Sequence, residues 1–193
     1  LPLSEISGKS AIYDKLKNYF PSLDKNGKEM SEIVAALKER SLSGYQYEGA
    51  EASFILLVEK ILGKYKSSFD LINYKVINEL PAIEGKVSSA IIKIRVDGTT
   101  KISASDGEGP VHAMDLALRS ALSDFYPEIR KVTLTDFKVR VLDSDKATAA
   151  KVRVLITSAN GADSWTTVGV SEDIIEASWT ALTDSIDYAL MRR

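Results

Sequence analysis

"SASDGEGPVHAMDLALRSAL" (residues 103–122) holds the end of a predicted strand, a loop with two glycines, and most of a predicted helix. Apolar side chains recur at helical spacing from Val111 to about Tyr126, and Pro110 suits the first turn of a helix. A loop of this kind presents backbone N–H groups at a helix N-terminus, where a carboxylate or phosphate can bind. The stretch predicts a strand-to-helix junction that could hold an anion.

The same succession occurs twice along the chain. Three strand-like segments precede this helix, and three more precede a second helix from Ile174 to about Met191. Tyr74-Lys75-Val76 matches Phe137-Lys138-Val139, and Ala117-Leu118 matches Ala181-Leu182 at nearly the same spacing. Each helix carries one apolar stripe that must cover a sheet. The pattern predicts an α+β fold with two βββα repeats, at about 67–128 and 132–193.

The region before the repeats has only helical periodicity. Helical segments end at Pro21 and before Gly44, and a third runs to Gly63 with one apolar face. A chain of 193 residues suits one ordinary domain with a smaller helical piece. We therefore expect a helical region at 1–66 and one domain at 67–193.

The charges and hydropathy exclude two classes of partner. There are 25 basic and 27 acidic residues with no basic block, so neither nucleic acid nor an anionic membrane is an expected partner. No apolar run approaches the ~20 residues of a membrane span, and the first residues have no signal-peptide pattern. We expect a soluble, cytoplasmic protein.

The chain lacks the residues that most catalytic and metal sites need. It has no cysteine and a single histidine, His112, which disfavours disulfides, thiolate catalysis and zinc sites. A lone histidine in the first turn of a helix is typical of a surface residue. No nucleophile, base and orienting group can be assembled, so we predict no catalytic residue, no metal site and no cofactor in this chain. An independent enzyme is disfavoured.

The loop Gly107–Pro110 has two interpretations. It can be a tight turn before a helix that starts with proline. In the second repeat, however, the matching segment "VGVSEDII" carries Glu172 and Asp173, as ordinary helix capping would. Because the loops differ while the helices match, the first loop is a candidate binding site.

Three longer strings carry a family resemblance: "SGYQYEGAEASFILLVEKILG", "DGEGPVHAMDLALRSAL" and "TVGVSEDIIEASWTALTDSIDYAL". Together they resemble the C-terminal part of the citramalate synthase and 2-isopropylmalate synthase family. The resemblance covers nearly the whole chain and is greatest to the citramalate synthase branch.

This resemblance implies an architecture and an activity. In that family a TIM barrel with a divalent metal condenses acetyl-CoA with a 2-oxo acid, and a C-terminal domain binds the end-product amino acid and dimerises. Residues 1–66 would be linker subdomains after the barrel, and 67–193 the regulatory domain. Because the chain starts at Leu1 and has no barrel, we expect it to be part of a longer acyltransferase that forms a homodimer.

The resemblance also implies an effector site at the first loop and the start of the second repeat. Its residues would be Gly107, Gly109, Pro110, Val111, His112, Leu134, Phe137, Val139 and Val141. The family usually has an acidic residue in place of His112 and often a tyrosine in place of Phe137. Asp115 or backbone carbonyls would then have to bind the ligand's ammonium group.

Three interpretations of the function stay open. The first is feedback inhibition by isoleucine in a citramalate synthase. The second is regulation by leucine in a 2-isopropylmalate synthase. The third is a structural dimerisation module that has no effector.

Overall fold

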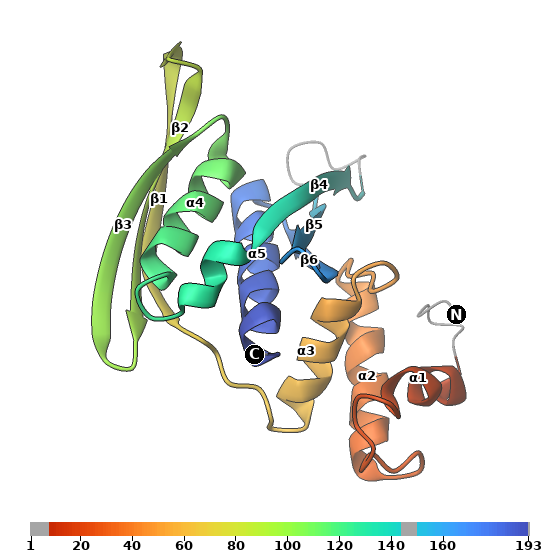
Figure 1. Ribbon diagram of the computed structural model, residues 1–193. Coiled ribbons are helices and arrows are strands. Elements are labelled where there is room, and N and C mark those ends of the chain that lie inside the picture. Colours follow the sequence, from red (N-terminus) through yellow and green to blue (C-terminus); the bar gives the residue numbers. More distant parts are fainter. Residues whose placement is uncertain (1–7, 144–149, 193) are drawn as a thin grey trace.

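The computed structural model describes residues 8–143 and 150–192 and confirms an α+β fold with two βββα units after a helical region (Figure 1). In chain order its elements are α1 (Lys9–Leu16), α2 (Lys28–Leu42), α3 (Glu51–Ile61), β1 (Asp70–Ile83), β2 (Lys86–Val96), β3 (Thr99–Gly107), α4 (Pro110–Leu122), the 3₁₀-helix η1 (Pro127–Lys131), β4 (Thr133–Val141), β5 (Val152–Ala159), β6 (Ser164–Ser171) and α5 (Ile174–Met191).

The sequence repeat is also a repeat of strand register. The two sheets have the orders β1-β2-β3 and β4-β5-β6, and all neighbouring strands are antiparallel. Ile92 pairs with Ser103 in the first sheet, and Ile156 pairs with Thr167 at the equivalent place in the second. The two units therefore align residue by residue across β2 and β3.

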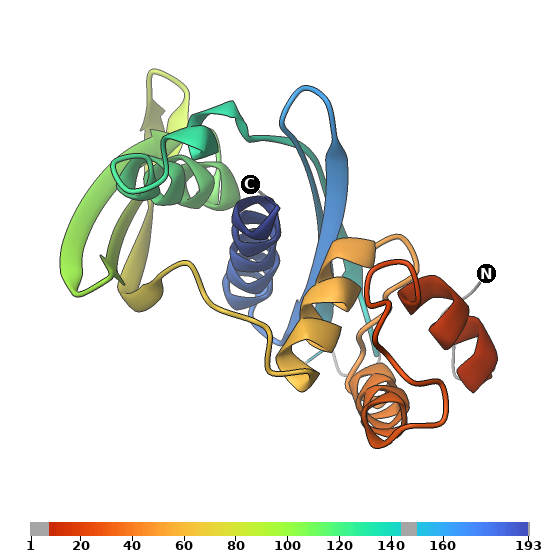
Figure 2. The ribbon, with the colours of Figure 1, turned by 60° about the horizontal axis from the view of Figure 1, so that its bottom comes forward.

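The two helices of the repeats lie between the two sheets (Figures 1 and 2). Helix α4 packs on β2 and β3, α5 packs on β5 and β6, and the helices contact each other. Alternation along β2 places Ile92 and Ile94 on the covered face, where Met114 and Leu118 of α4 are also buried. Burial of such side chains contributes roughly 1.5–3 kcal/mol each.

Two glycines allow each helix to approach its sheet closely. A Cβ atom built on Gly169 of β6 would overlap the carbonyl oxygen of Ala177 in α5. A Cβ atom on Gly107, at the end of β3, would lie 2.5 Å from the backbone nitrogen of Ala113 in α4. Since both clashes are with backbone atoms, neither position has room for a side chain.

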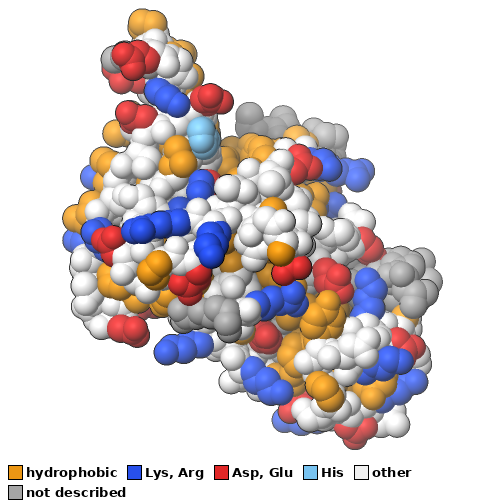
Figure 3. Space-filling view, viewed as in Figure 1, with side chains coloured by type: hydrophobic (Ala, Val, Ile, Leu, Met, Phe, Trp, Pro, Cys, Tyr) orange, Lys and Arg blue, Asp and Glu red, His pale blue; other side chains and the backbone are white. Residues whose placement is uncertain are grey.

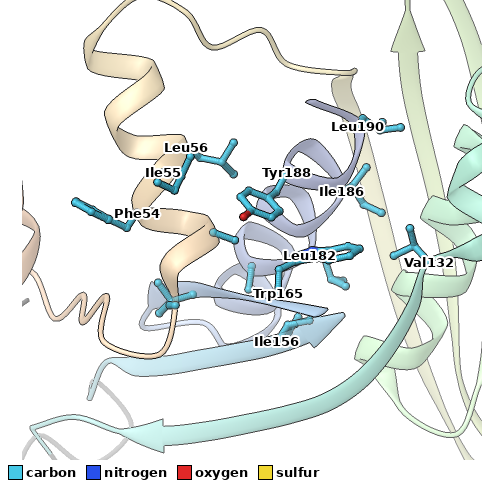
Figure 4. Close-up of a cluster of buried hydrophobic side chains, with 14 of the residues drawn as sticks. Phe54, Ile55, Leu56, Val132, Ile156, Trp165, Leu182, Ile186, Tyr188 and Leu190 are labelled. Carbon is cyan, nitrogen blue, oxygen red and sulfur yellow. The ribbon is translucent and has the colours of Figure 1, made fainter. Parts of the chain in front are cut away.

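Helix α3 packs on the second repeat as well as on α2. It contacts α5 and β6, and Phe54, Ile55 and Leu56 are buried in the cluster that Figure 4 shows with Leu182 and Tyr188 of α5. The last helix before residue 66 is thus joined to the repeats by an apolar interface.

Two carboxylates of α5 accept hydrogen bonds across this junction. The Ser53 hydroxyl of α3 donates to Asp184 of α5 over 2.7 Å, and the same oxygen accepts from the Val168 N–H over 2.9 Å. Asp187 is fully buried and accepts from the Tyr65 hydroxyl and, over 3.0 Å, from the Ser68 N–H. Burial raises the pKa of the Asp184 carboxyl, and Lys60 and the Ser53 hydrogen bond oppose this shift.

Two helices end earlier than the sequence pattern predicts. The helical segment predicted to end at Pro21 ends at Leu16, and the helix predicted to run to about Tyr126 ends at Leu122, before η1 starts at Pro127. Strands β1 and β2 are joined by a two-residue turn at Glu84-Gly85, where both residues have positive φ. This hairpin projects past α4 (Figure 1).

We predict that Gly169→Ala lowers the free energy of unfolding by about 3 kcal/mol, because the added methyl group must push α5 away from β6. Urea denaturation measures the change. The matched control is Gly109→Ala, since a Cβ there has no atom within 4 Å and the backbone is extended, and it should cost less than about 1 kcal/mol. Equal losses in the two variants would contradict the close approach.

Candidate functional site

A cavity of about 550 Å³ lies where α4, β4 and α5 meet, within the size range of small-molecule pockets. Both helices contribute their first residues, so their N-termini lie at the same end of the layer. The residues that line the cavity are Gly109, Pro110, Val111, His112, Asp115, Arg119, Thr133, Leu134, Phe137, Ile174 and Ile175.

The structure brings together six of the nine predicted effector residues. They are Gly109, Pro110, Val111, His112, Leu134 and Phe137. The other three do not line this cavity: Gly107 lies under the first turn of α4, and Val139 and Val141 lie further along β4.

Sequence reasoning missed the contribution of α5. Ile174 and Ile175 hold the positions in the second repeat that Pro110 and Val111 hold in the first. The sequence repeat could have indicated this contribution. Two helices that start at the same end of one layer bring equivalent residues of the two repeats together.

The two helix starts differ in their capping. Asp173 is the N-cap of α5, and its carboxylate accepts from the N–H groups of Ile175 (2.7 Å) and Glu176 (3.4 Å). The equivalent N-cap of α4 is Gly109, which makes no side-chain hydrogen bond. The first turn of α4 therefore offers N–H groups, at the positive end of the helix dipole, to a cavity that can hold a ligand.

His112 organises the loop before α4. It is exposed, in line with a surface histidine, and its Nδ1 accepts from the Glu108 N–H over 3.3 Å. Figure 3 shows this histidine at the surface beside hydrophobic side chains. With Nδ1 as an acceptor, the Nε2 side of the ring is the side that can reach a ligand.

A buried ion pair forms the polar floor of the cavity. Asp115 is 5% exposed, and Arg119 donates to both of its carboxylate oxygens through Nε (3.0 and 3.1 Å) and Nη2 (2.6 Å). Arg119 also donates to the Val132 carbonyl over 3.0 Å. The pair fixes α4 to the start of β4, so both walls of the cavity keep their spacing.

The remaining wall is apolar. Leu134 and Phe137 of β4 line the cavity together with Ile174 and Ile175 of α5, with Val111 of α4 beside them. Phe137 keeps 37% of its surface exposed, so the wall can still cover an aliphatic ligand. The uncapped helix start and the apolar wall have the chemistry to bind the two halves of an aliphatic amino acid.

No metal or membrane feature was found in the part of the chain that the structure describes. Within residues 8–143 and 150–192, no three His, Cys, Asp or Glu side chains are grouped as ligands for a metal ion. No described helix combines the length and hydropathy that crossing a bilayer requires.

The duplicated βββα unit, with its helices packed face to face around a ligand-sized cavity, defines a class of small α+β modules. Residues 48–190 match the family described as the LeuA allosteric (dimerisation) domain. The match includes both repeats and α3, and the chain belongs to this family.

Curated relatives extend the comparison to nearly the whole chain. The chain is 41% identical to (R)-citramalate synthase of Aquifex aeolicus (100% of the chain, 37% of the relative) and 43% identical to that of Geobacter sulfurreducens (97% and 36%). A probable 2-isopropylmalate synthase of Methanosarcina mazei is 27% identical (96% and 34%). The chain thus spans little more than a third of the length of these relatives.

We predict that Gly109→Asp raises the free energy of unfolding by about 0.5–1 kcal/mol, because the new carboxylate can cap α4 as Asp173 caps α5. Asp173→Gly is the reciprocal control and should lower it by a similar amount. Denaturation in urea at low salt measures both. A destabilised Gly109→Asp protein would mean that the N–H groups of α4 have no capacity for an added acceptor.

Proposed function

We propose that this chain is the feedback-regulatory and dimerisation part of a citramalate synthase, and that its effector is isoleucine. The observation that carries the proposal is the cavity between the two helix starts, with an uncapped α4 on one side and an apolar wall on the other. The higher identity to citramalate synthases than to the 2-isopropylmalate synthase favours this branch.

The ligand fits the cavity in one orientation. Its carboxylate lies at the N–H groups of Val111 and His112, and its side chain lies against Leu134, Phe137 and Ile175. Its ammonium group reaches Asp115. A carboxylate can accept about four hydrogen bonds, and Arg119 makes three to Asp115, so one site remains for the amine.

The activity of the whole protein is part of the same proposal. A barrel outside this chain would hold a divalent metal and acetyl-CoA and condense the latter with a 2-oxo acid, in the cytoplasm. The length of the curated relatives leaves room for such a catalytic part. Effector binding in this chain would then inhibit that part.

The homodimer would use an apolar strip of β4, formed by Phe137, Val139 and Val141. These side chains share the face that α5 covers over β5 and β6, yet they are 37%, 39% and 54% exposed. A second copy that covers the strip would remove this apolar surface from water. The strip begins at the cavity wall, since Phe137 belongs to both.

Titration of the chain with isoleucine, leucine and valine by calorimetry tests the effector. We expect isoleucine to bind most tightly, with leucine weaker by no more than about 10- to 200-fold, because the two ligands differ in the place of one methyl group. At ~100 times its dissociation constant, the ligand should raise the free energy of unfolding by roughly 2.7 kcal/mol.

Variants locate the ligand. Gly109→Val should abolish binding by filling the cavity, Phe137→Ala should weaken it, and Val141→Ala should leave it unchanged. Tighter binding of leucine would favour the 2-isopropylmalate synthase branch. If no amino acid binds and Gly109→Val behaves as the parent does, the chain is a structural dimerisation module.

Sedimentation velocity at high micromolar concentration tests the dimer. We expect a dimer for the parent chain and a monomer for Val139→Lys, because the ammonium group would be buried in the interface without a partner. The control is Ile102→Lys, an exposed apolar residue on the other sheet, which should stay dimeric. Dissociation by Ile102→Lys alone would place the interface on the first sheet.

A further inference from the structure

A second cavity, of about 380 Å³, lies between the turn after α2 and the ends of β4 and β5 that face it. Unlike the effector cavity, it is mainly polar. Three of its side chains are basic, Arg140, Lys151 and Arg153, and one is acidic, Asp143. Figure 3 shows basic side chains at this end of β4.

Two of the cations are neighbours in the sheet. Arg140 of β4 pairs directly with Arg153 of β5 in the strand register. Like charges that lie opposite each other destabilise a sheet. Burial lowers the pKa of Arg153, repulsion by Arg140 lowers it further, and attraction by Glu48 opposes this shift. This arrangement has a cost that an anion between the two guanidinium groups would offset.

The residues at the end of α2 supply hydrogen-bond acceptors for two of the three basic side chains. Arg153 donates to the Gly44 carbonyl through Nε (2.9 Å) and Nη2 (2.7 Å) and to the Gln46 side chain through Nη1 (2.8 Å). Lys151 donates to the Ser43 carbonyl over 3.4 Å. Cations at a helix C-terminus are favourable in themselves. These acceptors are neutral, however, and they leave both positive charges in place.

The end of α2 does not account for the position of Arg140 in this cavity. Among residues 8–143 and 150–192, its side chain has no hydrogen-bond or ion-pair partner, although it lines the cavity. Arg153 uses three of its five N–H donors, so two remain, and Arg140 lines the same cavity. The two guanidinium groups therefore offer several free donors to one space.

The backbone holds this geometry in place. Gly44 has a φ of +104°, and a Cβ there would lie 2.8 Å from the Leu142 side chain of the strand end. The turn after α2 thus lies directly on the second repeat and fixes the acceptors that position Arg153. Preorganised donors lose little freedom when a ligand binds.

We propose that this cavity binds a phosphate group, as the free ion or as a phosphomonoester, between Arg140 and Arg153. A tetrahedral dianion matches the forked donors of two guanidinium groups better than a single carboxylate does, and Lys151 adds a third positive charge. The bound anion would tie α2 to the second sheet. This site is separate from the effector cavity and does not depend on the proposed effector.

The test is titration of the chain with inorganic phosphate, followed by calorimetry and by phosphorus NMR, with ionic strength held constant by chloride. We expect saturable binding that Arg140→Gln weakens at least about tenfold. The matched control is Arg95→Gln, an exposed arginine on β2 of the first sheet, which should bind as the parent does. Urea denaturation of the same variants checks that the fold is intact, and isoleucine titration checks the effector cavity.

The results separate the outcomes. Binding of both inorganic phosphate and methyl phosphate supports a site for phosphomonoesters, and binding of inorganic phosphate alone supports a site for the free ion. The proposal is wrong if chloride at the same ionic strength gives the same binding signal as phosphate. It is also wrong if Arg140→Gln and Arg95→Gln change phosphate binding to the same extent. If phosphate does not bind but isoleucine does, the phosphate site is wrong and the proposed function stands. If isoleucine does not bind but phosphate does, the proposed effector is wrong and the phosphate site stands.

Discussion

The close contact between each helix and its sheet is the constraint on which the rest of the structure depends. At Gly169 the backbone of β6 touches the backbone of α5, and at Gly107 the end of β3 touches the first turn of α4. Neither contact tolerates a Cβ atom. Because each strand leads into its helix through a short loop, the contact also fixes where the helix begins. The two helices then start at the same end of the layer between the sheets, and their first turns become neighbours.

From this placement follows the difference between two repeats that are otherwise alike. The start of α5 is closed by its own carboxylate from Asp173, which satisfies the N–H groups that a ligand would need. The start of α4 has Gly109 at the equivalent position and stays open. One unit of a duplicated fold can thus keep a structural helix start while the other acquires a site, with α5 and β4 supplying its apolar wall.

The helical region is not simply attached to the repeats. Helix α3 meets α5 through Phe54 and Leu56. Ser53 hydrogen-bonds to the half-buried carboxylate of Asp184, and Tyr65 hydrogen-bonds to the buried carboxylate of Asp187. Burial of charge is costly unless each oxygen has a partner, so this junction resists partial opening. The family match starts at residue 48 and includes α3. A change at the second repeat therefore has a direct physical route, through α5, to the helices that precede it.

The sequence by itself determined the fold class, the two repeats and their order, because these depend on periodicity and on matches that recur at a nearly constant spacing. It also indicated the loop at Gly109 and the strand with Leu134 and Phe137, through the divergence of one loop and a family resemblance. Only the tertiary structure decided that Ile174 and Ile175 join them while Gly107, Val139 and Val141 do not line the cavity. It alone brought Arg140 and Arg153 to the end of α2. The physical reason is that periodicity only assigns a side chain to one face of a helix or strand. Which faces meet depends on how closely the helices pack on the sheets, and backbone contacts at single glycines set that distance.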